Sequence, residues 1–470
     1  MIDKIKKVVV WEVVILCVVV AQQMQERWVT IWGTSSYNES ANVLVCGSDG
    51  YVYAGGAHGV TLNEAAQRVL RLDPANGAVV GVSTAFQARI SGLSRMVYGN
   101  DGGVYTVGTY GVEGTPFPWT SMTVKRAWGW GDQFDHTTID DGTSIVYGED
   151  GNIYACGYGI RLFTNAPPHH AAFVISYSPD GSRRWTFVYD PYQTNGGIAN
   201  DIAYGSGNVY YCGVHNSQRA VICLTADNGN VSWVYTGGSG SFSSLVYERD
   251  GNIYTIGGDN ITSLKSTDGS LRWTYGWSGS KIIYGSDGNI YAIRDNGIIS
   301  LTTEGDYRWS YNTPGAVIRS IIYSAADGNV YVCGETNNDL VVIKINSVTG
   351  EEIVRYIYNG PTNEKDVGYT IDVGIDGYLY VGGYTTNNYQ RDLIVISLDP
   401  NPVNIREKKL FLSNGKISNN WKMSLNTFDI LGRSIPLQGK SANKNKLPSG
   451  NYFIPFYKDN KLQMIKIVKF

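Results

Sequence analysis

The chain alternates between short runs of β-branched and aromatic residues and turns that contain glycine. In the best-preserved stretch the successive runs are Ser144–Tyr147, Asn152–Cys156, Phe173–Tyr177 and Arg184–Tyr189. The first two runs flank the turn Asp150-Gly151, and the last two flank Asp180-Gly181. An Asp-Gly pair between apolar runs indicates a tight hairpin, because glycine accepts the positive φ that such turns need. The pattern therefore predicts a unit of four antiparallel strands.

This unit recurs eight times along the chain. Each copy has an Asp-Gly or Ser-Gly turn, one further residue, an aliphatic residue and an anchor tyrosine, and these tyrosines are Tyr53, Tyr105, Tyr154, Tyr210, Tyr254, Tyr291, Tyr331 and Tyr380. Their spacing runs from 37 residues (Tyr254 to Tyr291) to 56 residues (Tyr154 to Tyr210). Such a period is typical of β-propeller blades rather than of a helical solenoid. We predict an all-β fold in which residues 22–400 form an eight-bladed β-propeller.

The eighth repeat stops one strand short, after the run Leu393–Ser397. Its missing strand is predicted at the other end of the chain. There, Arg27–Trp32 repeats the Arg-Trp phrase that opens the fourth strand of repeat three. Pairing of the first strand with the last would close the ring and remove the exposed sheet edges that invite aggregation.

A tryptophan four residues after the turn glycine marks the fourth strand of four repeats, as Trp185, Trp233, Trp273 and Trp309. Repeat seven has Val354 at this place, repeat one has Gly81, and repeat two does not align. Large aromatic side chains at equivalent strand positions favour packing between sheets. We predict that these tryptophans fill the space between blades.

Both short turns of a repeat lie on one face, and the remaining connections lie on the other, variable face. These connections are long over residues 110–121, 129–142 and 158–171, and variable loops on a rigid scaffold often bind ligands. Aromatic rings there suit stacking on sugars or peptide side chains. The predicted ligand-binding set is Tyr110, Phe117, Trp119, Trp130, Phe134, His136, Tyr158, Phe163, His169, His170 and His215. His58 is assigned to the same face; the alternative for the histidines is that strand interiors simply reject this residue type.

Composition and charge narrow the classes of partner. Of 470 residues, 43% are hydrophobic and 17% are charged, and no run of like charges suggests a nucleic-acid arm. Residues 22–400 hold 22 basic and 36 acidic residues, a net charge of −14, so we predict no nucleic-acid partner. Lys4, Lys6 and Lys7 precede the apolar stretch Val8–Val20. This arrangement predicts a signal peptide over residues 1–21 and no transmembrane helix after its removal.

Five cysteines remain after removal of the signal. Three of them, Cys156, Cys212 and Cys333, lie two residues after an anchor tyrosine. Equivalent positions in different blades are too far apart for a disulfide. We predict that these cysteines are small buried residues, with a disulfide between Cys212 and Cys223 as the alternative.

The repeat ends at Pro400, and the charge then reverses, since residues 401–470 hold 13 basic and 3 acidic residues. Alternation in Leu425–Ile430 predicts a small C-terminal β-sandwich over residues 401–470. This tail resembles the C-terminal sorting domain of type IX secretion cargo in the segments Pro400–Val403, Phe428–Arg433, Leu447–Phe453 and Lys466–Lys469. The resemblance implies that residues 401–470 contact the secretion machinery and direct export across an outer membrane. A generic adhesive sandwich is the alternative.

The repeats themselves resemble the quinoprotein-type (PQQ-like) propeller superfamily in their Asp-Gly turns and trailing tryptophan. This resemblance implies a fold and not an activity. A quinoprotein dehydrogenase needs a Cys-Cys pair and an acid cluster for Ca²⁺, and the chain has no Cys-Cys pair. No His-x-x-x-His or Cys-x-x-Cys spacing indicates a metal site, and no nucleophile elbow is present. We predict no catalytic residue, no metal and no cofactor.

The leading hypothesis is a secreted or cell-surface propeller that binds a glycan, a peptide or a protein and is not an enzyme. The first alternative is an extracellular enzyme, either glycan-cleaving or quinone-dependent, with its active site in a funnel on the variable face. The second alternative is a purely structural surface protein.

Overall fold

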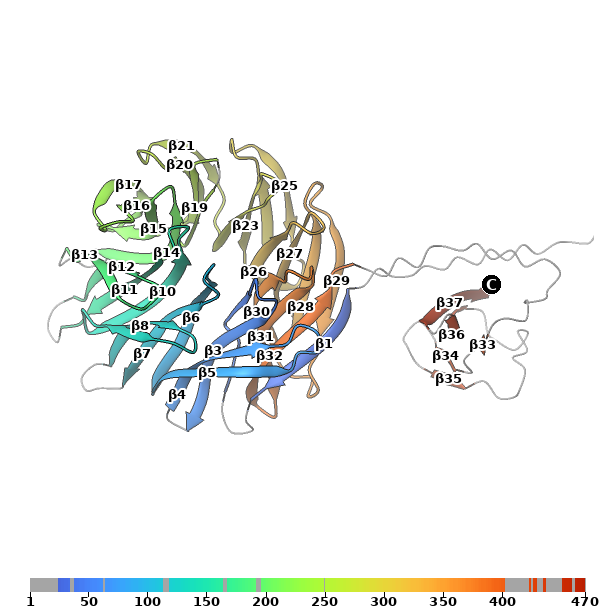
Figure 1. Ribbon diagram of the computed structural model, residues 1–470. Coiled ribbons are helices and arrows are strands. Elements are labelled where there is room, and N and C mark those ends of the chain that lie inside the picture. Colours follow the sequence, from blue (N-terminus) through green and yellow to red (C-terminus); the bar gives the residue numbers. More distant parts are fainter. Residues whose placement is uncertain are drawn as a thin grey trace, which may run out of the picture. The chain divides into compact units, whose positions relative to one another are not determined.

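The computed structural model divides the chain into two units, residues 24–401 and residues 1–23 with 402–470 (Figure 1). The structure describes residues 24–33, 38–61, 64–112, 118–163, 167–191, 196–248, 250–401, 422–423, 426–428, 434–436, 450–458 and 461–469. Side chains are described in the first unit, except at residues 58–64 and 90. The predicted signal peptide lies outside the described residues. Those residues form strands throughout, which confirms the all-β prediction, and among them no helix could cross a membrane.

The strands of the first unit follow the predicted repeats. Repeat one forms a sheet of β2 (Val43–Cys46), β3 (Val52–Thr61), β4 (Glu64–Leu72) and β5 (Val79–Ala88). Repeats two and three share a sheet of β6 (Ile90–Tyr98), β7 (Val104–Val112), β8 (Trp119–Arg126), β9 (Gly131–Phe134), β10 (Ile139–Tyr147), β11 (Ile153–Arg161), β12 (His169–Tyr177) and β13 (Arg183–Tyr189). A single parallel pair, Ile139 with Thr120, joins its two halves.

The next four repeats each form a separate four-stranded antiparallel sheet. Repeat four has β14 (Gly197–Gly205), β15 (Asn208–His215), β16 (Gln218–Thr225) and β17 (Val231–Ser239). Repeat five has β18 (Ser244–Tyr247), β19 (Asn252–Gly257), β20 (Asn260–Lys265) and β21 (Leu271–Gly276). Repeat six has β22 (Lys281–Tyr284), β23 (Ile290–Arg294), β24 (Gly297–Leu301) and β25 (Tyr307–Asn312). Repeat seven has β26 (Ala316–Ser324), β27 (Asn329–Thr336), β28 (Asp339–Asn346) and β29 (Glu352–Tyr358).

The last sheet of this unit joins the two ends of its chain. Repeat eight supplies β30 (Asp366–Val373), β31 (Leu379–Asn387) and β32 (Gln390–Asp399), and the fourth strand is β1 (Gln25–Trp32) from the N-terminal side. Strand β1 runs antiparallel to β32, with Trp28 opposite Ser397 and Trp32 opposite Leu393. The expected pairing of first and last strands is therefore present.

The core lies between consecutive sheets. The second and third strands of a repeat are buried on both sides, as in β12, whereas the fourth strand, as in β17, is exposed at alternate residues. Each described hydrophobic cluster joins neighbouring repeats; one, for example, brings Tyr154 and Val174 of repeat three against Ile222 of repeat four. Another joins Trp28 and Tyr380 of repeat eight to Leu70 of repeat one. Figure 1 shows the sheets following one another around a centre.

The marker tryptophans act as predicted, as packing between sheets. The indole Nε1 of Trp185 donates a hydrogen bond of 2.8 Å to the carbonyl oxygen of Ala226 in the next repeat, and its ring packs on Gly229. Trp233, Trp273 and Trp309 repeat this contact with the carbonyls of Ser266, Thr303 and Ser347. Trp28 makes it with Pro74 of repeat one. The N-terminal strand thus carries the same connection as the other repeats.

Cys156, Cys212 and Cys333 are buried free thiols, as predicted. Cys212 lies opposite Val221, and Cys223 lies opposite Tyr210, so the alternative disulfide is not formed.

In the tail, the described residues form one antiparallel sheet of β33 (Lys422–Met423), β34 (Asn426–Phe428), β35 (Ser434–Pro436), β36 (Gly450–Lys458) and β37 (Lys461–Lys469). The predicted sandwich stays a prediction.

Candidate functional site

The first strand of each repeat is here called the inner strand, and six of the inner strands share a polar residue at one position. Six inner strands have a tyrosine as their last or second-last residue, and the residue three positions before this tyrosine is always polar. These residues are Arg95, Ser144, Asp201, Ser244, Lys281 and Ser320. Five of them line one pocket of about 200 Å³, to which six consecutive repeats contribute. The pocket therefore lies where the inner strands meet.

A β-bulge directs further side chains toward this pocket. In repeat three the pairing of β10 with β11 shifts between Gly142 and Ser144, which leaves Thr143 as the extra residue. The equivalent extra residues are Ser94, Asn200, Arg319 and Tyr369. A bulge bends its strand and re-aims a side chain, and bulges are common next to binding sites. Residue 157 opposite this bulge is glycine, because a Cβ there would overlap the carbonyl oxygen of Asp141.

Asp201 is the centre of a hydrogen-bond network in the pocket. Its carboxylate accepts hydrogen bonds from Ser144 (2.7 Å) and Ser244 (2.9 Å) of the flanking repeats. The Arg95 guanidinium lies 3.2 Å away, and the backbone N–H of Leu245 also donates to the carboxylate. Asp201 thus links the inner strands of repeats two, three and five to that of repeat four.

Lys281 and Arg319 bring positive charge to the same pocket. The Lys281 ammonium donates to Ser320 Oγ at 3.0 Å. Burial, followed by the charge of Arg95, lowers the pKa of Lys281 to about 8. Arg319 pairs with Glu335 at 2.5 Å, and the other oxygen of Glu335 lies 2.6 Å from Lys365.

Two larger hollows share lining residues with this pocket. One, of about 500 Å³, shares Thr143 with it and is lined by Ser91, Thr109, Asp141 and Tyr158, among others. The other, of about 540 Å³, shares Ser280 and Arg319 with it and is lined by Asn42, Asp295 and Tyr369, among others. We call these three neighbouring hollows together the inner-strand funnel. Tyr158 and Tyr369 are the aromatic residues among its lining.

Of the predicted ligand-binding residues, Tyr158 lines the funnel. Burial and the neighbouring Asp141 raise the pKa of its hydroxyl. Tyr110 is half-buried and packs against Phe86. Trp119 is 56% exposed at the start of β8, and Phe134 is buried against Phe173. Phe117 lies outside the described residues, as does the side chain of His58.

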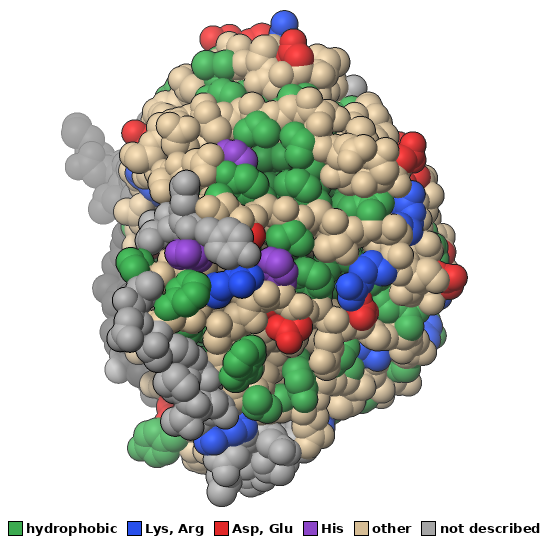
Figure 2. Space-filling model, turned by 90° about the vertical axis from the view of Figure 1, so that its left-hand side faces the viewer, with side chains coloured by type: hydrophobic (Ala, Val, Ile, Leu, Met, Phe, Trp, Pro, Cys, Tyr) green, Lys and Arg blue, Asp and Glu red, His purple; other side chains and the backbone are tan. Residues whose placement is uncertain are grey.

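Four predicted histidines, His136, His169, His170 and His215, lie on repeats two to four and are not among the residues that line the funnel. His136 Nε2 lies 3.4 Å from the carboxylate of Asp190, which also pairs with Arg161. Phe163 contacts His169 edge-on, and β12 places His170 next to it. His215 stacks on Tyr189 at 4.1 Å, and burial lowers its pKa. Figure 2 shows histidine side chains close to basic and hydrophobic ones on this side of the molecule. Among the described residues no acidic, cysteine or histidine group is arranged to hold a metal ion.

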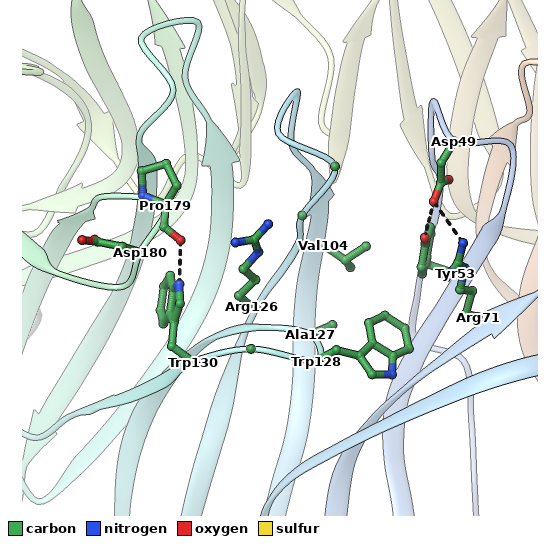
Figure 3. Close-up of a pocket in the computed structure, with 13 residues that line it drawn as sticks. Asp49, Tyr53, Arg71, Val104, Arg126, Ala127, Trp128, Trp130, Pro179 and Asp180 are labelled. Atoms are coloured by element: carbon green, nitrogen blue, oxygen red, sulfur yellow. Dashed lines mark hydrogen bonds and ion pairs between the residues drawn. The ribbon is translucent and has the colours of Figure 1, made fainter.

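Trp130 was assigned to the variable face, and this placement is wrong. The turn between β8 and β9 is short, so Trp130 lies on the face of the Asp-Gly turns (Figure 3). Its Nε1 donates to the carbonyl of Pro179 at 2.8 Å, and its ring packs on Gly181. Trp130 is therefore the marker tryptophan of repeat two. It stands one residue after the turn glycine, Gly129, whereas the other marker tryptophans stand four residues after theirs.

A hollow of about 510 Å³ lies beside Trp130, with the half-exposed ring of Trp128 on its wall. Trp128 has a positive φ of 58°, and its ring lies near Gly81, where repeat one lacks its marker tryptophan. Trp128 thus occupies part of the space that the missing ring would fill.

Comparisons with known proteins support PQQ-like repeats in part of the chain. A family model described as outer membrane protein assembly factor BamB, of the PQQ type, matches residues 171–387. The structure of the designed protein Ika8 has a TM-score of 0.54 at 11% identity, over 79% of this chain and 99% of that one. The C-terminal WD40 domain of Sif2 has a TM-score of 0.53 at 10% identity, over 80% and 99%. Sqt1 from Chaetomium thermophilum has a TM-score of 0.51 at 11% identity, over 79% and 99%. No curated protein matches the chain.

The repeats within residues 171–387 match this PQQ-like family model, and the solved structures show a β-propeller fold. At these identities the solved structures establish the fold alone. Of the funnel lining, sequence reasoning named Tyr158 and missed the polar residues of the inner strands, because it looked for ligands on the variable loops. A signal was present, however, since Arg95, Asp201 and Lys281 are charged residues inside predicted strands, each three positions before a tyrosine.

Proposed function

We propose that residues 24–401 form a single eight-bladed propeller, closed by β1, which acts as a binding module. The pairing of β1 with β32 and the packing of Trp28 on repeat one support closure. The joint sheet of repeats two and three counts as two blades in this proposal, because one parallel pair connects its halves.

The observation that carries the binding proposal is the convergence of polar side chains from six blades on the inner-strand funnel. Hydroxyl, amide and charged groups there can orient a polar ligand, while Tyr158 and Tyr369 offer rings to a sugar or a peptide side chain. Of the three carboxylates that line the funnel, two are engaged, since Asp201 has five partners and Asp141 accepts a hydrogen bond of 3.0 Å from Thr109. This arrangement favours binding over the glycan-cleaving alternative.

The binding proposal is tested by screening the full chain on glycan and peptide arrays. The variant Tyr158→Ala alters the funnel, and Trp119→Ala alters the exposed ring at the start of β8. We expect Y158A to weaken binding of the hit at least tenfold and W119A to leave it unchanged. The reverse result would move the site to the outer surface, and no hit on either array would favour a structural role.

We also propose that the protein is secreted or displayed at the cell surface by a type IX-like route, with residues 401–470 as the sorting signal. The basic tail, the apolar stretch before Ala21 and the outer-membrane description of the matching family support this proposal. Expression in a bacterium with that machinery tests it. Removal of residues 402–470 should retain the propeller in the periplasm, and continued export would contradict the proposal.

A further inference from the structure

The funnel pocket is basic although the propeller around it is acidic. Arg95, Lys281 and Arg319 line it, against the single carboxylate of Asp201. The surrounding residues 22–400 carry a net charge of −14. A positive pocket within a negative molecule attracts anions locally.

Two of the three cations already have a carboxylate partner. Arg95 lies 3.2 Å from Asp201, and Arg319 lies 2.5 Å from Glu335. Lys281 differs, because no carboxylate of the described residues lies within ion-pair distance of its ammonium group. The partner of this ammonium is the neutral hydroxyl of Ser320.

Asp372, a second acid whose charge acts on Lys281, is itself poorly able to balance this charge. Asp372 accepts hydrogen bonds from the backbone N–H groups of Cys46 (2.8 Å) and Val373 (2.9 Å). Burial raises the pKa of Asp372, which disfavours its charged form. A half-buried ammonium without a counter-ion is costly, and an anion that reached it would offset that cost.

Neutral donors complete the pocket. Ser243 and Ser280 expose their side chains to it, and neither hydroxyl has a hydrogen-bond partner among the residues that the structure describes. The volume of about 200 Å³ holds one oxyanion group and a few waters, since a water occupies about 30 Å³.

We propose that the inner-strand funnel binds an oxyanion group of its ligand, a carboxylate or a phosphate, with Lys281 as the counter-ion and Arg95 and Arg319 beside it. This inference rests on the proposed function, because the remainder of the ligand would lie in the wider hollows of the funnel. It narrows the ligand class from polar to acidic glycans or peptides.

The proposal predicts a characteristic pH dependence. Arg95, Asp201, Asp372 and Cys333 are the ionisable groups that act on Lys281, and its pKa is about 8. The ammonium form, which holds the anion, is therefore present at pH 6.5 and largely lost at pH 9.5. Anion affinity should fall across this interval.

The test uses calorimetry on the full chain with three probes, inorganic phosphate, glucuronate and neutral glucose. Tighter binding of phosphate would indicate that the ligand carries a phosphate group, and tighter binding of glucuronate would indicate a carboxylate. The variants are Lys281→Met, which removes the charge, and Lys281→Arg, which keeps it at high pH. Lys265→Met, at an exposed residue of β20, is the matched control.

We expect K281M to lose at least tenfold in affinity for the preferred anion, with K265M unchanged. K281R should bind it at pH 6.5 and at pH 9.5 alike. Equal binding by K281M and the wild type, or no binding of either anion, would overturn the anion site. An array ligand that depends on Tyr158 but not on Lys281 would overturn this inference and leave the binding module standing.

Discussion

At the scale of single residues, the repeated Asp-Gly turn serves the fold in two ways. In repeat three, one carboxylate oxygen of Asp150 accepts the backbone N–H of Asn152 and so holds the turn, and the other accepts the hydroxyl of Tyr154 at 2.6 Å. Arg184 then donates to the same hydroxyl at 3.2 Å and to Ala226 of the next blade. The recurrence of Asp, Tyr and Arg-Trp in the sequence thus reflects one network that links turn, strand and neighbouring blade.

Lys281 illustrates the opposite case, a residue that the fold tolerates at a cost. Its folded pKa of about 8 is lower than its ordinary value of 10.5, so the unfolded chain holds the proton more tightly. The cost is full below pH 8 and disappears as the pH rises toward 10.5. We expect Lys281→Met to increase the free energy of unfolding by roughly 1–2 kcal/mol at pH 6.5, and by less at pH 9.5. Urea denaturation in a buffer free of phosphate measures the free energy of unfolding. A stability gain of K281M that grows with pH would contradict the lowered pKa of Lys281.

At the scale of the element, the sequence predicted strands and turns well because both depend on local patterns. The Asp-Gly phrase located the hairpins, and the tryptophan series located the contacts between sheets. Repeat two could not be aligned because its outer turn is shortened, which moves Trp130 next to Gly129. The funnel was missed for a different reason. A bulge depends on pairing between strands, so the direction of Thr143 or Arg319 is not visible in a single strand.

The contact between a marker tryptophan and the next turn can be tested by two glycines with the same backbone conformation. Gly229 and Gly207 both have a φ of 73°. A Cβ on Gly229 would lie 2.6 Å from the ring of Trp185, whereas a Cβ on Gly207 would meet nothing within 4 Å. Gly207→Ala should cost about 1 kcal/mol of stability through backbone strain alone. Gly229→Ala should lower the free energy of unfolding by about 1–3 kcal/mol more than Gly207→Ala does, because the new methyl group displaces the indole of Trp185. Chemical denaturation compares them, and equal losses would show that the tryptophan packing contributes little.

At the scale of the whole molecule, closure determines whether the funnel exists. The pocket is lined by six repeats whose inner strands are adjacent only if each sheet packs on the next. The charged residues that meet there, from Arg95 to Arg319, are separated by more than 200 positions in the sequence. A binding site assembled in this way has no local sequence motif, which is why its chemistry could not be found by motif search.

Removal of residues 24–33 tests closure directly. The truncated chain would leave β32 without its partner β1 and uncover the surface of repeat one on which Trp28 packs. An open edge strand invites pairing between chains, so we expect a lower melting temperature, a broader transition and aggregation visible by light scattering.

Removal of residues 402–470, which belong to the other unit, is the control and should leave the melting transition of the propeller in place. The anion probe adds a functional measure, since the open form should also lose phosphate or glucuronate binding. A truncated chain that melts like the full one would mean that β1 is an accessory strand and that seven sheets hold the ring without it.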